Sequence, residues 1–193
     1  ISSIGTVPLD LSQVYFASAV SGKGLAAFPG LAMVFYNHEV SPAPTALPCV
    51  LDLGLYAREC GVPFTHSSNL VDSLHTALRR VNWHERFRDL AEISAWLRAR
   101  LRRLDFSLVG STAQPSPAVV TIALPDRVSS VAVSAELEKE GYLVSANSRY
   151  LRDRNWIQIC LMGEASRDQL AAVSTALLQL CDDPFCTAAT LRC

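Results

Sequence analysis

The order of apolar patterns in the second half of the chain constrains its fold most. After residue 105, a β-branched run, a helical pattern, two more strand-like runs and a final helical pattern follow one another. Gly141 fits a C-cap for the first helix, and a capping-box sequence beginning at Ser166 opens the last one. This order predicts a compact α+β unit in which helices cover a small sheet. The strands are expected at residues 119–124, 142–145 and 156–161, and the helices at 129–140 and 166–180.

The first half contains strand patterns, but too few of them for a sheet of its own. Residues 14–20 and 31–36 are rich in aromatic and β-branched side chains and flank a glycine-containing loop. Two or three strands do not form a stable sheet with both faces covered, so this piece looks incomplete alone. Helices are expected from Ser67 to about Val81 and over residues 84–104. The arginines of the second helix are expected to form a solvated face: Arg98, Arg100, Arg102 and Arg103.

Composition excludes several classes of function. The 193 residues allow one substantial domain, or a small domain with part of another. The net charge of −1 argues against nonspecific nucleic-acid binding. No apolar run approaches the roughly 20 residues that span a bilayer, and the first residues lack the features of a signal peptide. We therefore expect a cytoplasmic protein. A charged fraction of 18%, against a typical value of about 25%, favours a surface partly covered by a partner.

The cysteines and histidines do not predict a metal site. Metal ligands usually occur as pairs two to four residues apart, with a second cluster elsewhere, and the six cysteines show no such pair. We expect no metal, and reduced, mostly structural thiols. The histidines are expected to be ordinary surface or helix-cap residues: His38, His66, His75 and His84.

Lys23 is the strongest candidate for chemistry. It is one of two lysines, with Lys139, in a chain that has 17 lysines and arginines together. A desolvated lysine can lose its proton and become a nucleophile, which arginine does not do. Its amine can then form a Schiff base with a carbonyl compound. Gly22 and Gly24 flank Lys23, so that backbone or a ligand can approach it closely. A solvated lysine in a glycine-bounded turn is the alternative.

Two common catalytic motifs do not fit this segment. A phosphate-binding P-loop needs a glycine five residues before the Gly-Lys pair and Ser or Thr after it, where this chain has Ala17 and Gly24. The Gly-x-Ser-x-Gly elbow of serine hydrolases fails at both glycine positions around Ser21.

The surroundings of Lys23 resemble a known family, the class V aminotransferases, which use pyridoxal phosphate. Residues 1–10 look like the segment that follows the cofactor-binding aspartate, and Lys23 with residues 28–32 resembles the Schiff-base lysine and its Pro-Gly strand. Residues 51–53 and 63–66 are similar to the stretch before a helix in 2-aminoethylphosphonate–pyruvate aminotransferases. A weaker resemblance includes residues 156–163, so that the likeness extends over nearly the whole chain.

The resemblance implies a fold and a set of roles. The fold would be α/β, the C-terminal part of a fold-type-I pyridoxal-phosphate transferase. Lys23 would bind pyridoxal 5′-phosphate as a Schiff base and act as general base. Thr65 matches a position that helps hold the cofactor phosphate of the neighbouring subunit, which implies a dimer. Ser21 would place a hydroxyl near the phosphate, or serve only as a turn residue.

It also implies a division of the chain into four parts. They are the end of the large cofactor-binding domain (1–66), connecting helices (67–104), a small α+β domain (105–181) and a tail (182–193).

Three departures from the family pattern shape the functional hypothesis. The aspartate that pairs with the pyridine nitrogen would fall two positions before Ile1, and the glycine-rich phosphate loop lies further upstream. We therefore interpret this sequence as the C-terminal half, with the N-terminal half a separate chain or residues cleaved or left out upstream. The loop after Asp10 is shorter than in relatives, and Ser21-Gly22 replaces the usual polar pair before the lysine.

The third departure concerns the substrate. Gln158 stands where the family has its substrate-carboxylate arginine, and glutamine cannot give the same charged, bidentate grip. Arg154, or its neighbours Arg149 and Arg152, would substitute. The hypothesis is an aminotransferase acting between a small amino compound and a 2-oxo acid. A lyase, racemase or desulfurase of the same fold, a non-catalytic partner subunit, and a binding module for a phosphorylated ligand are the alternatives.

Overall fold

The structure is a computed structural model that describes residues 2–110 and 113–182. It divides into two compact units, Ile1–Val81 and Asn82–Cys193, and each is described by itself. The division falls inside the segment 67–104 that the sequence assigns to connecting helices. Within the described residues, every helix is too short or too polar to cross a membrane.

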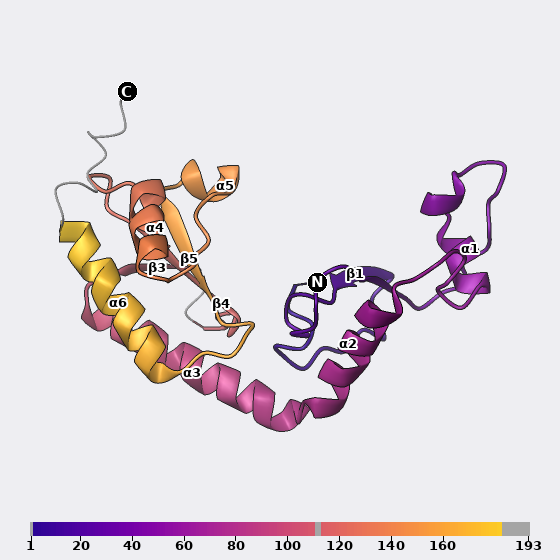
Figure 1. Cartoon of the computed structure of the whole chain (residues 1–193), viewed down its shortest axis with the longest axis horizontal. Helices are drawn as coiled ribbons and strands as arrows, with labels where there is room; N and C mark the ends of the chain where they lie inside the picture. The colour runs from indigo at the N-terminus through magenta and orange to yellow at the C-terminus, as the bar shows by residue number, and fades with distance from the viewer. Residues whose placement is uncertain (1, 111–112, 183–193) are drawn as a thin grey trace. The chain divides into compact units, whose positions relative to one another are not determined.

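The second unit is a three-stranded antiparallel sheet covered by helices (Figure 1). Its central strand β4 pairs with β3 on one side and β5 on the other, with Ile122 opposite both Leu108 and Ile157. Helices α3 and α6 run alongside each other and α4 packs on α6. The elements are β3 Ser107–Val109, β4 Val119–Ala123 and β5 Trp156–Cys160, with α3 Trp83–Arg103, α4 Ser130–Lys139, α5 Arg149–Arg152 and α6 Arg167–Asp182.

One face of this sheet carries the core. Val120, Ile122 and Ile157 alternate with more exposed residues and pack with Leu97 of α3 and Leu177 of α6, all of them with no exposed surface. The alternation has the period of two that a half-buried strand shows. The opposite face carries half-buried side chains, among them the paired residues Thr121 and Gln158.

The predicted helix signals of this unit are confirmed in atomic detail. Ser166 donates its backbone N–H to the Gln169 side chain and accepts from the Gln169 N–H, which is a capping box. Gly141 has φ +89° after α4, and its N–H and that of Tyr142 return to the carbonyls of Glu138 and Leu137. That pattern is a Schellman C-cap.

Asn155, just before β5, connects this strand to the segment before α4 through hydrogen bonds of its side chain. Its side-chain amide N–H groups donate to the carbonyls of Leu124, Pro125 and Val128, and its amide oxygen accepts from the Ser130 N–H at 2.8 Å. Asn155 itself has φ +56°, a conformation that asparagine tolerates better than most residues.

Two expectations for this unit are wrong. Residues 142–145 do not form a strand: Leu143 is 83% exposed, and only Ser145 reaches the edge of β5, in an isolated bridge to Gln158. Arg98 is not on a solvated face, because it is only 6% exposed and donates to the carbonyls of Ser116 and Val119, both at 2.9 Å. Burial lowers the pKa of the Arg98 guanidinium, and the positive charge of Arg102 lowers it further.

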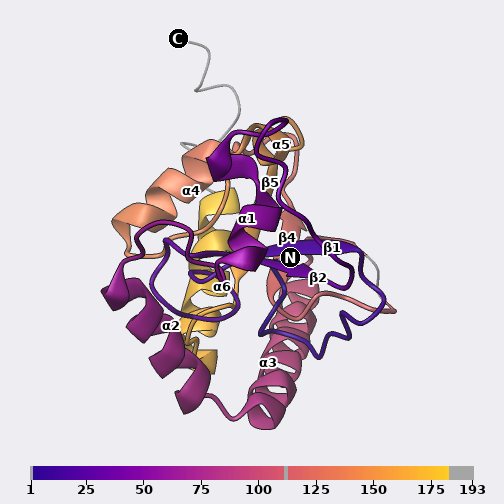
Figure 2. The ribbon, with the colours of Figure 1, turned by 90° about the vertical axis from the view of Figure 1, so that its right-hand side faces the viewer.

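The first unit is an antiparallel hairpin with helices. Strand β1 (Phe16–Val20) pairs with β2 (Ala32–Tyr36) so that Val20 lies opposite Ala32, next to the turn (Figure 2). The remaining elements are a short 3₁₀ turn at Cys49–Leu51, α1 at Leu53–Arg58 and α2 at Ser68–Arg80. Of the predicted tail at 182–193, Asp182 is the last residue of α6, and residues 183–193 lie outside the described residues.

Candidate functional site

Lys23 lies in the turn that joins β1 to β2, and Ser21 braces this turn from inside. The Ser21 hydroxyl is completely buried, donates to the Phe28 carbonyl at 2.6 Å and accepts from the Leu31 N–H at 3.2 Å. Backbone hydrogen bonds from Ser21 to Leu31 and from Ala27 to Ser21 close the loop. In this arrangement the hydroxyl is engaged in holding the turn, which is the structural alternative that the sequence left open for Ser21.

The glycines on either side of Lys23 allow two close backbone contacts. A Cβ on Gly22 would lie 2.8 Å from the Cα of Pro29, and one on Gly24 would lie 2.1 Å from the carbonyl oxygen of Ile4. Neither distance is compatible with a side chain. The predicted reason for the glycines, close approach, therefore applies to the chain's own backbone on both sides of the lysine.

The side chain of Lys23 is exposed, and its Nζ donates to the Ser2 hydroxyl at 3.0 Å. The amine is thus exposed on a hydrogen-bonded turn and has a neutral partner. Sequence reasoning missed Ser2, because its partnership with Lys23 spans 21 positions and has no signal in local spacing.

Thr65 belongs to the same unit but not to this turn. It is exposed in the connection between α1 and α2 and shares no hydrogen bond with the Lys23 turn within the described residues. Its predicted role concerns a neighbouring subunit and stays a prediction.

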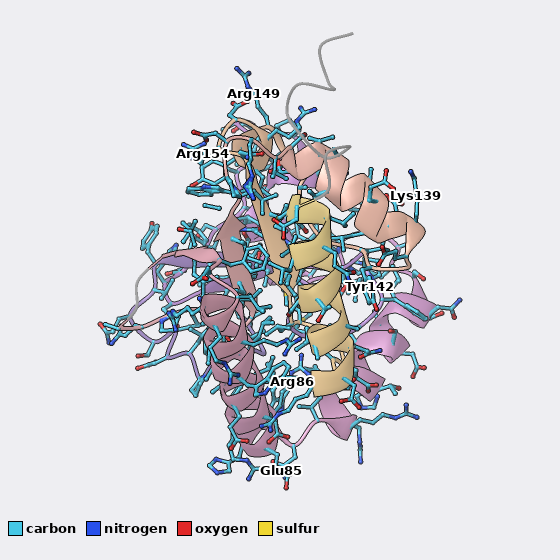
Figure 3. The ribbon with its side chains drawn as sticks, turned by 90° about the vertical axis from the view of Figure 1, so that its left-hand side faces the viewer. Glu85, Arg86, Lys139, Tyr142, Arg149 and Arg154 are labelled. Carbon is cyan, nitrogen blue, oxygen red and sulfur yellow. The ribbon has the colours of Figure 1, made fainter. Side chains whose placement is uncertain are left out.

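Gln158 and Arg154 lie in the second unit and are both held by neighbours. The Gln158 side-chain amide donates to the Thr121 hydroxyl at 3.0 Å across the sheet. The Arg154 guanidinium carbon lies 3.9 Å from the centre of the Tyr150 ring and 5.7 Å from that of Trp156. Arg154 and Arg149 project at the end of the unit where α5 lies (Figure 3). One nitrogen of the exposed Arg154 guanidinium also donates to the Tyr150 carbonyl at 3.2 Å. Arg154 is therefore a positive charge stacked on an aromatic surface, and this charge could attract an anion.

The residues of the turn fit a cofactor that forms a covalent bond with a lysine amine of the protein. Lys23 presents a primary amine to solvent, and the chain's other lysine, Lys139, is engaged with the Glu136 carboxylate at 2.7 Å. Among the described residues no group of three histidine, cysteine or acidic side chains is placed to share a metal ion.

Solved structures share this fold. An aspartate aminotransferase of subgroup IV from Thermus thermophilus is 23% identical with a TM-score of 0.77, over 94% of this chain and 53% of that one. An alanine–glyoxylate aminotransferase from Nostoc sp. is 24% identical with a TM-score of 0.75, over 93% of this chain and 52% of that one. A pyridoxamine–pyruvate aminotransferase from Mesorhizobium loti is 19% identical with a TM-score of 0.77, over 98% of this chain and 53% of that one.

These likenesses confirm the predicted fold class. The chain has the α/β fold of the C-terminal part of a fold-type-I transferase and spans about half the length of the aminotransferases it matches. No protein-family model matches the sequence, and no curated protein matches it either.

Proposed function

We propose that this chain is the lysine-bearing C-terminal half of a class V, pyridoxal-phosphate-dependent aminotransferase of the cytoplasm. It would transfer an amino group between a small amino compound and a 2-oxo acid. One observation carries the proposal: an exposed lysine amine lies on a hydrogen-bonded hairpin turn, in a fold shared with aminotransferases.

Lys23 would carry the chemistry of the protein side. Its amine would hold the cofactor covalently. Once released, the amine would act as general base and move a proton from the substrate Cα to the cofactor. When bound, pyridoxal phosphate supplies an electron sink for the negative charge that remains on that carbon. The hydrogen bonds of Ser21 and the close contacts of Gly22 and Gly24 would keep the turn from moving during the transfer.

The second unit would recognise the substrate through a neutral amide and an adjacent arginine. The Gln158 amide can hydrogen-bond a substrate but adds no charge, because glutamine is neutral at every pH of interest. Arg154 supplies the nearest positive charge in sequence, and Tyr150 stacks on it. This pairing favours an amino compound whose α-carboxylate is absent or is gripped by a side chain other than residue 158.

A partner would complete the first unit, which agrees with the proposed upstream half. Apolar side chains such as Phe16, Val34 and Tyr36 are about 40% exposed on the hairpin. A cleft of about 610 Å³ lies between β2 and the segment from Val50 to Gly61, and apolar side chains form most of its wall. Burial of such surface is the main source of stability in a folded domain. We propose that the N-terminal half covers it, and that a second copy contributes Thr65 in a homodimer.

The test uses the protein together with its upstream half and two matched lysine variants. Incubation with pyridoxal phosphate followed by borohydride should leave a reduced adduct on Lys23, detected by mass spectrometry of the peptides. Lys23→Ala should abolish the adduct without unfolding the protein, whereas Lys139→Ala should keep it. Absence of an adduct on Lys23 would contradict the cofactor assignment and favour a non-catalytic partner subunit. An adduct without amino transfer to any 2-oxo acid would favour a lyase, racemase or desulfurase.

A further inference from the structure

The hydrogen bond between Ser2 and Lys23 joins the start of the chain to the hairpin turn. Ser2 Oγ lies 3.0 Å from Lys23 Nζ, within the normal range for this kind of bond. Within the described residues Lys23 has no acidic partner, whereas Lys139 is paired with Glu136. The hydroxyl therefore orients the Lys23 amine without adding a counter-charge.

Backbone contacts fix the segment that carries Ser2. Thr6 is completely buried and donates both its N–H and its hydroxyl to the Ser3 carbonyl, at 3.0 and 2.7 Å. Gly5 has φ +79°, and a Cβ there would lie 2.6 Å from the Gly24 carbonyl oxygen. Together with the Ile4–Gly24 contact, this holds residues 3–6 against the lysine turn itself. The place of Ser2 next to the amine thus follows from packing on both sides of Lys23.

We infer that Ser2 is a positioning residue, whose hydroxyl holds the Lys23 amine in place at the turn. The chemical meaning of this role depends on the proposed function, in which Lys23 binds the cofactor. The hydrogen bond itself does not depend on the proposed function, so the hydrogen bond and the reactivity of Lys23 are measured separately.

The first measurement follows the amine directly. Labelling with ¹⁵N-lysine gives two ammonium signals, from Lys23 and Lys139, and the rate at which each exchanges hydrogen with water is read by NMR. Ser2→Ala should raise the exchange rate of Lys23 about three- to tenfold, since one hydrogen bond to a charged group is lost. Ser2→Thr should restore the rate. Ser3→Ala, which keeps the carbonyl that Thr6 uses, and the Lys139 signal are the controls. An unchanged Lys23 rate in Ser2→Ala would overturn the inference.

The second measurement follows reactivity, in the protein together with its upstream half. After a short, fixed incubation with pyridoxal phosphate and borohydride, the adduct on Lys23 relative to Lys139 should fall about three- to tenfold in Ser2→Ala and recover in Ser2→Thr. A ratio that does not change while the exchange rate rises would overturn the positioning role. If pyridoxal phosphate shows no preference for Lys23 in the unmodified protein, the proposed function fails, and the exchange measurement still decides the hydrogen bond.

Discussion

The two units of this chain bury their apolar residues very differently. The core cluster, from Leu90 to Cys181, belongs entirely to the second unit. Among the described residues of the first unit, the buried apolar side chains are Ala17, Ala19, Leu25 and Leu31, which lie in the hairpin and its turn. Large apolar side chains remain exposed throughout that unit, the hairpin strands included, from Leu9 to Leu78. In the described part of the second unit, the exposed large ones are Val131, Leu143 and Tyr150.

The difference shows that the second unit has a hydrophobic core of its own, whereas the unit that carries Lys23 has no comparable core among its described residues. The second unit has a three-stranded sheet with one helix-covered face, which is the minimum for independent stability. The first unit has order concentrated around Lys23, where glycine contacts and the Ser21 hydroxyl fix the turn. Within the part of the chain that the structure describes, its hairpin strands have one neighbour each, so their outer edges suit the sheet of a larger domain.

The largest expected effect tests the core of the second unit. Leu97→Ala removes a side chain with no exposed surface and should cost about 2–5 kcal/mol of unfolding free energy. All three tryptophans, Trp83, Trp96 and Trp156, lie in this unit, so fluorescence during denaturant unfolding reports on it. Val34→Ala in the first unit, at a side chain 39% exposed, should leave that transition within about 0.5 kcal/mol. Equal shifts from both variants would show that the comparison is wrong.

The buried arginine gives the next largest effect. Arg98→Met leaves the carbonyls of Ser116 and Val119 without their donor and should cost about 2–3 kcal/mol in the same fluorescence experiment. Arg102→Met, one turn further along α3 and exposed, is the matched control and should change stability by less than about 0.5 kcal/mol. Equal losses of stability in the two variants would indicate that Arg98 is solvated, as the sequence predicts.

The order around Lys23 is tested by a glycine substitution. In Gly24→Ala the new methyl group meets the backbone oxygen of Ile4, so we expect a local cost of about 1–2 kcal/mol. Backbone hydrogen exchange in β1 measures this cost, and the Lys23 ammonium should exchange faster as in Ser2→Ala. Gly163→Ala, with no heavy atom within 4 Å of the new Cβ, is the control. Exchange rates in Gly24→Ala equal to those of the unmodified protein would mean that residues 3–6 do not hold the turn.

The smallest effect concerns a helix end in the stable unit. Ser166→Ala removes one half of the capping box of α6 and should cost about 1 kcal/mol. Thermal unfolding followed by circular dichroism measures it, and Ser166→Thr should keep most of the stability. A loss above 3 kcal/mol would indicate that α6 depends on its first turn more than on Leu177 and the other buried side chains.

Local signals predicted the elements that have strong local causes. Gly141 and Ser166 mark helix ends because each makes its capping contacts within a few residues. The sequence also contained a signal for the missed helix α1, since Asp52 accepts from the Leu55 N–H as an N-cap. Similarly, Ser148 caps the missed helix α5. Helices of six and four residues have too little periodicity to be predicted from spacing alone.

Long-range contacts explain what the sequence could not predict. Arg98 is buried because carbonyls some twenty residues further along the chain accept its hydrogen bonds, and arginine on a helix otherwise indicates a solvated face. Residues 142–145 have strand-like composition, but after the Schellman turn only Ser145 comes within reach of β5. Lys23 was recognised from its scarcity and neighbours, whereas its partner Ser2 depends on how Gly24 packs.

The junction at Asn155 has a consequence for the chemical ageing of this protein. Loss of ammonia from its side chain would replace the amide N–H groups, which now face three carbonyl oxygens, with a carboxylate that can only accept. An anion would then oppose the oxygens of Leu124, Pro125 and Val128, and the loop before α4 would detach from β5. Such a change at a single residue would weaken the second unit at a position far in sequence from Lys23.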